Sequence, residues 1–310
     1  MKSCWKYGAG ILLAAAVYLL LPGVEPKVYS ETRGGNQCAD RGEGKNVTDR
    51  SLERDSGIQS APSDHRILED MKRIEYDEIK YDEESSEYYG FIRGKIPILI
   101  SAPHGAKHFR KRENRWRGED EYTSSLAIEL GKLTGAYVIY VKNKTREDPN
   151  NDRMSKYKVA VARAVKEYHI KFLLDLHGSD EERPYKIDVG IINDEAQRSS
   201  CPSFKEAIQE AFSDFEPEIF NKRFCANDTC TLTSFARNKL GIEAAQVEIN
   251  AKYRIVERKP DNSRTKRGID ASFKANPKDV LDLITKLERM IGGISQKIEN
   301  GTLAKCNNNP

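Results

Sequence analysis

The sequence lacks several features that would assign it to a class at once. Lys and Arg number 51 against 48 Asp and Glu, so the excess of basic charge that nucleic-acid binding requires is missing. Gly (21) and Pro (12) occur in ordinary numbers, which excludes fibrous and low-complexity classes. No internal repeat is visible. The 6 cysteines form no CxxC pair, so a structural zinc knuckle is not expected.

The N-terminal segment, residues 1–25, has the layout of a signal peptide. Lys2 and Lys6 precede an apolar run over residues 8–21, which Pro22 ends. The run is shorter than the roughly 20 residues of a membrane-spanning helix, so a retained membrane anchor is the second interpretation. Both interpretations predict an extracytoplasmic protein, either secreted or tethered. In such a compartment Cys225 and Cys230 could form a small disulfide loop, with two free thiols as the alternative.

The domain organisation follows from a change of pattern along the chain. Residues 26–85 are mostly polar and predict a linker or N-terminal arm, with a strand or hairpin at the domain edge over residues 71–90. Residues 86–295 carry the regular apolar pattern of one folded domain, and residues 296–310 form a tail.

Strands and helices are expected to alternate within that domain. Short apolar runs predict strands at residues 96–105, 136–142, 170–178, 186–192 and 242–250. Helical spacing is found at residues 121–133, 152–168, 203–215, 231–241 and 277–294. This order predicts an α/β fold with a mostly parallel sheet and helices on both faces.

Two histidines share a setting that suggests a metal site. His104 and His177 each follow an apolar strand and precede Gly, and strand C-terminal ends line the ligand crevice of an open α/β sheet. Catalytic zinc usually takes three protein ligands. Glu119, Asp120 and Glu121, just before a helix, are the candidates for the third ligand, and helix capping is the alternative role for each.

Further polar residues are predicted at the same edge of the sheet. Glu248 ends an apolar strand, so it could act as a general base beside the metal, or it could pair with Arg254. The acidic cluster at residues 147–152 follows another strand, although Asp, Pro and Asn also make turns. His108, in the basic run of residues 107–117, is expected on a solvated loop as a surface or substrate-side residue.

The motifs SAPHG, EDEYT, DPNND, DLHGS and VEIN occur in this order over residues 90–255. This series resembles the N-formylglutamate amidohydrolase family, a branch of the zinc carboxypeptidase-like hydrolases. The resemblance implies a phosphorylase/hydrolase-like α/β domain that binds one Zn²⁺ through His104, Asp120 and His177. Glu121 and Glu119 are the alternatives to Asp120. It also implies hydrolysis of an amide (C–N) bond, with Glu248 helping to activate water at the metal.

The sequence departs from the family at the expected substrate-binding arginine. Family members that act on formylglutamate carry an arginine directly after the Asn of the Asp-x-Asn motif, where this chain has Asn151. Asn150, Asn151, Arg153 and Arg254 are therefore the candidate substrate-binding residues.

Three functions stay open at this point. The first is hydrolysis of a small acyl-amino acid or peptide. The second is an exported carboxypeptidase-like or poly-γ-glutamyl peptidase activity. The third is a non-catalytic binding module that has retained the fold.

Overall fold

The computed structural model describes residues 64–192, 200–216, 218–259 and 272–301. The expected signal segment, residues 1–25, lies outside these ranges, so the signal peptide and the extracytoplasmic location stay predictions. Among the helices of the described ranges, none combines the length and the apolar character that a membrane span needs.

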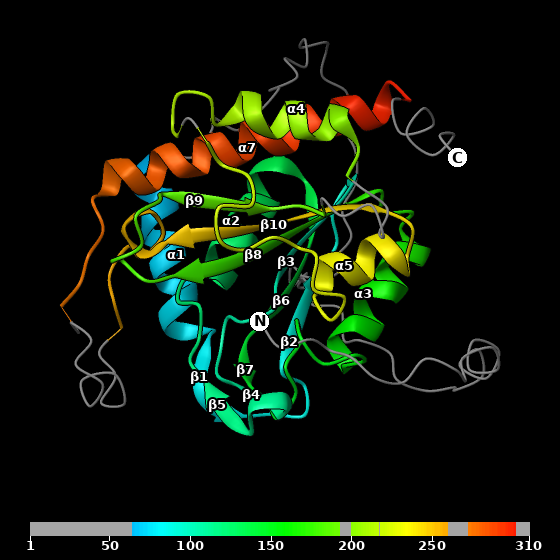
Figure 1. Cartoon of the computed structure of the whole chain (residues 1–310). Coiled ribbons are helices and arrows are strands. Elements are labelled where there is room, and N and C mark those ends of the chain that lie inside the picture. Colours follow the sequence, from blue (N-terminus) through cyan, green and yellow to red (C-terminus); the bar gives the residue numbers. More distant parts are fainter. Residues whose placement is uncertain (1–63, 193–199, 217, 260–271, 302–310) are drawn as a thin grey trace, which may run out of the picture. The chain divides into compact units, whose positions relative to one another are not determined.

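A six-stranded sheet forms the centre of the domain (Figure 1). Its order is β2 (Tyr89–Ile92), β6 (Ala136–Val141), β3 (Ile96–Ala102), β8 (Phe172–Ser179), β10 (Glu243–Asn250) and β9 (Ile187–Gly190). The four inner strands are parallel, and β2 and β9 are antiparallel edge strands. The predicted α/β class with a mostly parallel sheet is confirmed.

Helices cover both faces of this sheet, as predicted. One face carries α1 (Asp64–Asp77), α2 (Thr123–Thr134), α4 (Pro202–Ala211) and α7 (Pro277–Glu299). The other carries α3 (Lys156–Glu167) and α5 (Leu232–Asn238). The strands supply alternate residues to the two cores: Leu174 and Leu176 face the first, and Leu173 faces the second. Asp175 and His177 alternate in step with Leu173 and therefore point to the second face.

Short elements surround the carboxyl edge of the sheet. They are β1 (Lys80–Glu84) paired with β7 (Asn143–Lys144), the hairpin of β4 (His108–Arg110) and β5 (Arg115–Arg117) with η1 (Lys111–Glu113) between them, and η2 (Ala251–Tyr253). The basic run of residues 107–117 is thus a β-hairpin rather than the loop that was expected.

The predicted domain boundary is wrong at its N-terminal side. Residues 64–85, assigned to the polar linker 26–85, contain α1 and β1, and Met71 and Ile74 of α1 are buried in the first core. At the other end α7 continues to Glu299, past the expected limit of residue 295. The folded domain therefore begins at least as early as residue 64.

The cysteines also differ from expectation. Cys225 and Cys230 are not joined to each other in a disulfide. Cys201, at the start of α4, is disulfide-bonded instead.

Candidate functional site

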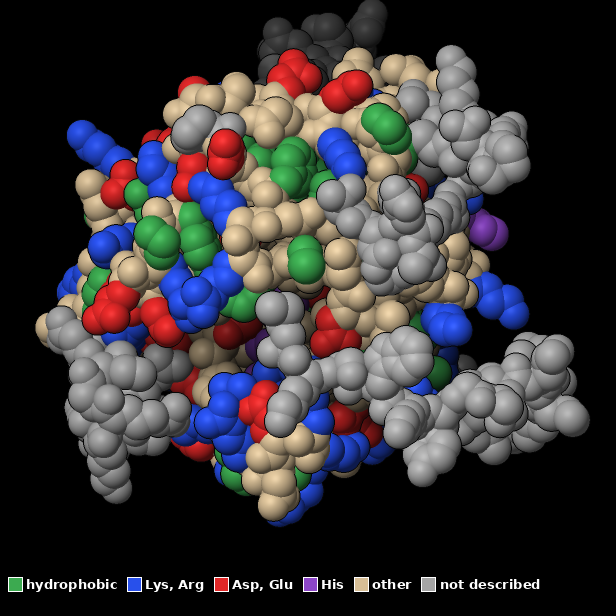
Figure 2. Space-filling model, viewed as in Figure 1, with side chains coloured by type: hydrophobic (Ala, Val, Ile, Leu, Met, Phe, Trp, Pro, Cys, Tyr) green, Lys and Arg blue, Asp and Glu red, His purple; other side chains and the backbone are tan. Residues whose placement is uncertain are grey.

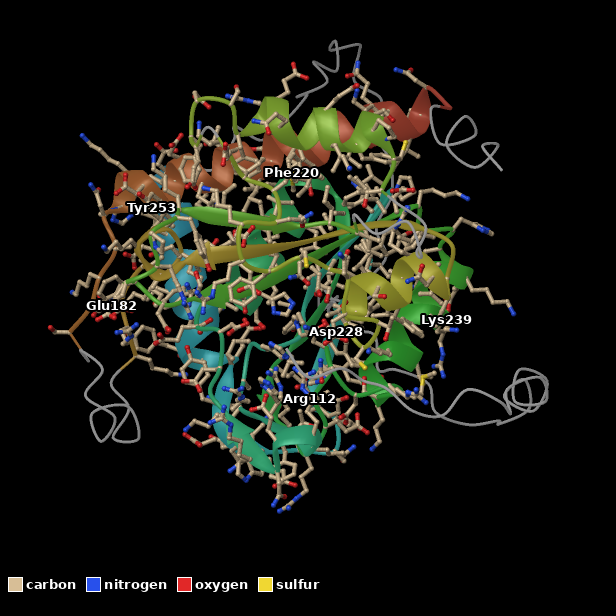
Figure 3. All side chains as sticks on the ribbon, in the orientation of Figure 1. Arg112, Glu182, Phe220, Asp228, Lys239 and Tyr253 are labelled. Carbon is tan, nitrogen blue, oxygen red and sulfur yellow. The ribbon has the colours of Figure 1, made fainter. Side chains whose placement is uncertain are left out.

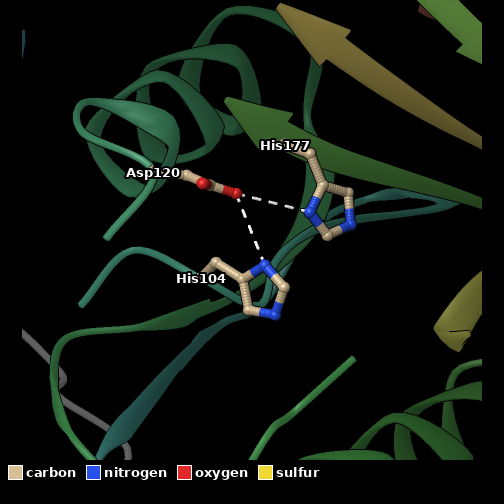
Figure 4. Close-up of side chains that lie close together, drawn as sticks. All are labelled: His104, Asp120 and His177. Atoms are coloured by element: carbon tan, nitrogen blue, oxygen red, sulfur yellow. Dashed lines mark ion pairs between the residues drawn. The ribbon is translucent and has the colours of Figure 1, made fainter. Parts of the chain in front are cut away.

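Three predicted metal ligands come together at the carboxyl edge of the sheet (Figure 4). His104 lies just after β3, His177 lies on β8, and Asp120 lies just before α2. The Asp120 Oδ2 atom is 3.4 Å from Nδ1 of His104 and 3.4 Å from Nδ1 of His177. One ligand atom from each residue falls within 4.8 Å of the others.

The spacing of these atoms suits a shared cation better than direct hydrogen bonds. A good N–H···O hydrogen bond measures about 2.7–3.2 Å. Two zinc–ligand bonds of about 2.0–2.1 Å that meet at a tetrahedral angle place their ligand atoms about 3.3–3.4 Å apart. The 3.4 Å separations therefore match two edges of a tetrahedral coordination shell.

Each imidazole is oriented by a second, buried carboxylate. His104 Nε2 lies 3.0 Å from Asp148 Oδ1, and His177 Nε2 lies 3.1 Å from Asp175 Oδ2. The side chains of Asp148 and Asp175 are 0% exposed. A carboxylate on Nε2 holds the proton there and leaves Nδ1 as a ligand, which is the usual arrangement around metal-bound histidine.

The two supporting aspartates were predicted to different extents. Asp148 belongs to the acidic cluster at residues 147–152, which was placed at this edge without a role. Asp175 was not singled out. Its signal was available, because a residue two positions before His177 on the same strand points to the same face of the sheet.

Charge is strongly coupled within this site. Burial alone raises the pKa of Asp120, but the two imidazoles outweigh it and hold the pKa well below its usual range. Burial lowers the pKa of both histidines, yet their carboxylate partners leave the pKa of His104 raised and that of His177 well above its ordinary value. When both imidazoles are neutral, as metal binding requires, the rings supply no positive charge to the carboxylates around them, so the site favours an added cation.

The local backbone positions Asp120 through a strained turn. Tyr122, the residue that caps α2, has a left-handed backbone with φ of 63°, which a bulky residue adopts only where the surroundings enforce it. The Tyr122 amide donates to the buried Glu75 carboxylate of α1 at 2.8 Å. The Asp120 amide donates to the His104 carbonyl at 2.8 Å, which ties the two ligand segments together.

The alternatives to Asp120 are directed elsewhere. Glu121 is buried and receives the Arg258 guanidinium, whose Nε lies 3.1 and 3.0 Å from its two carboxylate oxygens. Glu119 is also buried but is not among the groups whose ligand atoms converge.

Glu248 lies beside the candidate metal ligands. It is the direct register partner of His177 on the neighbouring parallel strand, so both side chains point to the same face. Burial raises the pKa of Glu248 to about 7, while His177 lowers it and Asp120 raises it. A carboxylate with this pKa can accept and return a proton near neutral pH.

The predicted substrate-binding residues have other contacts. Asn150 Oδ1 accepts from the Leu232 amide at 2.7 Å, and the Asn151 amide donates to Asp148 Oδ1 at 2.9 Å. Arg153 is exposed. Arg254 is only 4% exposed and donates to the carbonyls of Glu121, Ser179 and Ile249. Arg254 thereby joins the ends of β8 and β10 to the segment before α2, and a role of these four residues in substrate binding stays a prediction.

His108 is not a surface residue. It is 2% exposed, and its ring stacks on that of His104 with the centroids 3.9 Å apart and the planes at 4°. Burial lowers its pKa to about 3, with His104 adding to the effect. His108 therefore supports the His104 ring as a neutral side chain.

The β4–β5 hairpin closes one side of the site. Arg110 Nε donates to Asp148 Oδ2 at 2.6 Å, so the hairpin is bonded to the carboxylate that orients His104. Arg112 of the hairpin pairs with Asp228 at 3.3 Å, and the two lie close together in Figure 3. In Figure 2, red and purple side chains appear at the bottom of a hollow above a group of blue ones.

No family model matches the sequence, and no curated protein matches it. Similar solved structures include an N-formylglutamate amidohydrolase from Ralstonia eutropha JMP134, at 11% identity and a TM-score of 0.42 over 69% of this chain and 98% of that one. A bacteriophage poly-gamma-glutamate hydrolase has 17% identity and a TM-score of 0.43 over 70% of this chain and 93% of that one. A metallo-carboxypeptidase from Burkholderia cenocepacia has 15% identity and a TM-score of 0.40 over 69% of this chain and 65% of that one. The family that the sequence motifs resemble is thus represented among these structures.

Proposed function

We propose that the chain is a zinc-dependent hydrolase of amide (C–N) bonds. The observation that carries the proposal is the convergence of His104 Nδ1, His177 Nδ1 and Asp120 Oδ2, with a buried carboxylate behind each imidazole. Two nitrogens and one oxygen are a donor set that Zn²⁺ accepts, and three protein ligands leave a position for reactants. When bound, Zn²⁺ supplies Lewis acidity that polarises a carbonyl and makes water easier to deprotonate.

Glu248 would carry the proton through the reaction. Its carboxylate takes a proton from water as the water oxygen attacks the carbonyl carbon of the substrate. The same proton then passes to the nitrogen, the C–N bond breaks, and Glu248 returns to its ionised form. A pKa of about 7 suits both steps, because neither the acid nor the base form of Glu248 is strongly disfavoured near neutral pH.

The substrate class is an acyl-amino acid or a peptide, cleaved outside the cytoplasm if the N-terminal signal prediction holds. A carboxypeptidase-like or poly-γ-glutamyl peptidase activity is the variant of this proposal with a longer substrate. The position of Glu248, paired in register with His177 on the neighbouring strand, favours both over a non-catalytic binding module, since binding alone has no use for a proton carrier beside the ligand set.

The test combines metal analysis with turnover. We expect about one zinc per purified chain in the parent, and its loss in His177→Ala and Asp120→Ala. Glu248→Gln should keep the metal and lower kcat on the order of 10²–10⁴-fold on a panel of acyl-amino acids and peptides. Glu288→Gln, on the exposed face of α7, is the control and should match the parent. A parent that holds no zinc after gentle purification, or a Glu248→Gln variant with full turnover, would contradict the proposal.

A further inference from the structure

Basic charge is concentrated on the β4–β5 hairpin. Residues 107–117 carry six basic side chains and one acidic one, Glu113, in a chain whose net charge is only +3. The hairpin is closed by antiparallel pairing of β4 with β5 and lies at the lower margin of the domain in Figure 1. Blue side chains gather at the same end of the molecule in Figure 2. A nearly neutral chain therefore presents a surface that is basic locally.

The acidic residue of the hairpin is shared among four guanidinium groups. The Glu113 carboxylate lies 2.8 Å from Arg115 Nε and 2.5 Å from Arg117 Nη2. It also lies 3.6 Å from Arg110 and 3.9 Å from Arg112. The hydrogen bond from Arg117, with that from Arg115 adding to it, lowers the pKa of Glu113 to about 2. One ionised carboxylate leaves most of this positive charge unbalanced.

Carboxylates outside the hairpin balance only two of the four arginines. Arg110 donates to an aspartate behind the candidate metal site at 2.6 Å, and Arg112 pairs with another aspartate at 3.3 Å. Within the described residues, Arg115 and Arg117 form ion pairs with Glu113 alone, and their side chains are 59% and 34% exposed. Ion pairs at the surface contribute little free energy. Both guanidinium groups can therefore donate to an anionic partner.

Trp116 lies between these two arginines in the sequence and is the only exposed aromatic residue of the described ranges, at 38%. Its ring packs edge-on against Phe109 with the centroids 5.5 Å apart, and Lys144 Nζ lies 4.4 Å from its centroid. Tryptophan is enriched at the boundary between lipid headgroups and acyl chains, where one end of the ring is apolar and the other is wet. A soluble anionic polymer without aromatic groups would need the cations but not the exposed ring.

We propose that the β4–β5 hairpin docks on a membrane that contains anionic lipids. Arg115 and Arg117 contact the lipid phosphates, and the Trp116 ring lies at the level of the headgroups. Each basic side chain close to an anionic bilayer strengthens binding by about fivefold. The docking surface requires neither a bound metal nor turnover, so it stands or falls separately from the proposed hydrolysis.

Two features of the chain give this docking a consequence. The apolar run over residues 8–21 is predicted to enter a membrane both as a signal peptide and as an anchor. Arg110 of the same hairpin is bonded to Asp148, the carboxylate that orients His104. A docked hairpin therefore holds the candidate metal site close to the lipid surface.

The fluorescence of Trp116 reports docking directly. The chain has 2 tryptophans, so Trp5→Phe leaves Trp116 as the only one. With vesicles of phosphatidylglycerol and phosphatidylcholine, its emission should move to shorter wavelength and be quenched by bromine-labelled acyl chains. Vesicles of phosphatidylcholine alone should cause neither change. An unchanged emission with the anionic vesicles, or equal changes with both kinds, would overturn the proposal.

Titrating the same signal with vesicles at about 0.1 M salt measures the contribution of the arginines. In the Trp5→Phe background, Arg115→Gln with Arg117→Gln should weaken binding by about 25-fold, or about fivefold per charge. Arg93→Gln with Arg289→Gln removes the same charge from exposed residues after β2 and on α7, and should stay within about twofold of the parent.

Two further arms separate the partner and the fold. Arg115→Lys with Arg117→Lys keeps the charge and should bind about as the parent does. If this variant bound as weakly as the glutamine variant, the loss would come from the hairpin structure, and electrostatic docking would be wrong. Hairpin-dependent binding of dextran sulfate without binding to vesicles would identify a soluble polyanion as the partner and overturn the membrane assignment.

Discussion

At the scale of single residues, the sequence identified which side chains meet but not how each one is oriented. His104, His177 and Glu248 could be predicted because apolar strands ended at them, and parallel strands bring such ends together. The contact between His104 and Asp148 joins residues 44 positions apart in the chain. It depends on how β6 and the segment after it return to β3, and no local pattern encodes that geometry.

The pH dependence of turnover should follow the ionisation of the Glu248 carboxylate. Its carboxylate must be ionised to accept a proton, and its pKa is raised to about 7. The ionised fraction falls as pH drops through this value, so kcat/KM should fall about tenfold per pH unit on the acidic side. A bound cation stabilises the ionised form of Glu248 and lowers its pKa, which moves the acidic side of the pH–rate profile to lower pH.

The measurement is kcat/KM from about pH 5 to pH 9, with zinc content checked at each end because protonated histidines release metal. The residual turnover of Glu248→Gln should lack the acidic limb. A parent rate that rises as the pH falls would rule out Glu248 as the base.

At the scale of secondary structure, the prediction succeeded where apolar periodicity was strong. The inner strands and the helices from α2 to α7 were found near their expected positions. The β4–β5 hairpin was missed because five of its residues between 110 and 117 are basic, and charged segments form strands only when tertiary contacts support them. Here Trp116 packs against Phe109 across the hairpin, with Lys144 4.4 Å from the Trp116 ring centroid.

A buried aspartate pairs with each imidazole, so replacing either aspartate should weaken metal binding measurably. Asp175→Asn and Asp148→Asn leave the three ligands in place but remove the charge that fixes each ring. Each should weaken zinc binding by about 10–100-fold, the usual effect of changing a group that orients a ligand. Competition with a chelator of known affinity measures this change.

One control variant defines the interpretation of that result. Asp152→Asn removes a neighbouring carboxylate that pairs with the exposed Lys111, and it should leave zinc affinity within about twofold. If Asp175→Asn bound zinc as tightly as the parent, the orientation of His177 would have to come from other contacts.

At the scale of the whole molecule, the sequence misplaced the start of the folded domain. Buried residues of α1 recur at Ile67, Met71 and Ile74, which is helical spacing. This helical spacing was hard to recognise in the sequence because the helix also carries many charges and follows a long polar stretch. Helix α1 lies against α2, and its Glu75 accepts hydrogen bonds from the Tyr122 amide and the Ser125 hydroxyl. The segment assigned to a linker therefore supports the turn that presents Asp120.

This role of α1 predicts a large loss of stability from a single change. Met71 is 0% exposed within the first core, so Met71→Ala should lower the free energy of unfolding by about 2–5 kcal/mol. Glu69→Ala, on the exposed face of the same helix, should change it by less than about 0.5 kcal/mol. Urea unfolding followed by circular dichroism measures both. A Met71→Ala variant as stable as the parent would contradict the conclusion that α1 packs in the core of the folded domain. A destabilised variant that also binds zinc more weakly would show that α1 holds the Asp120 turn in place.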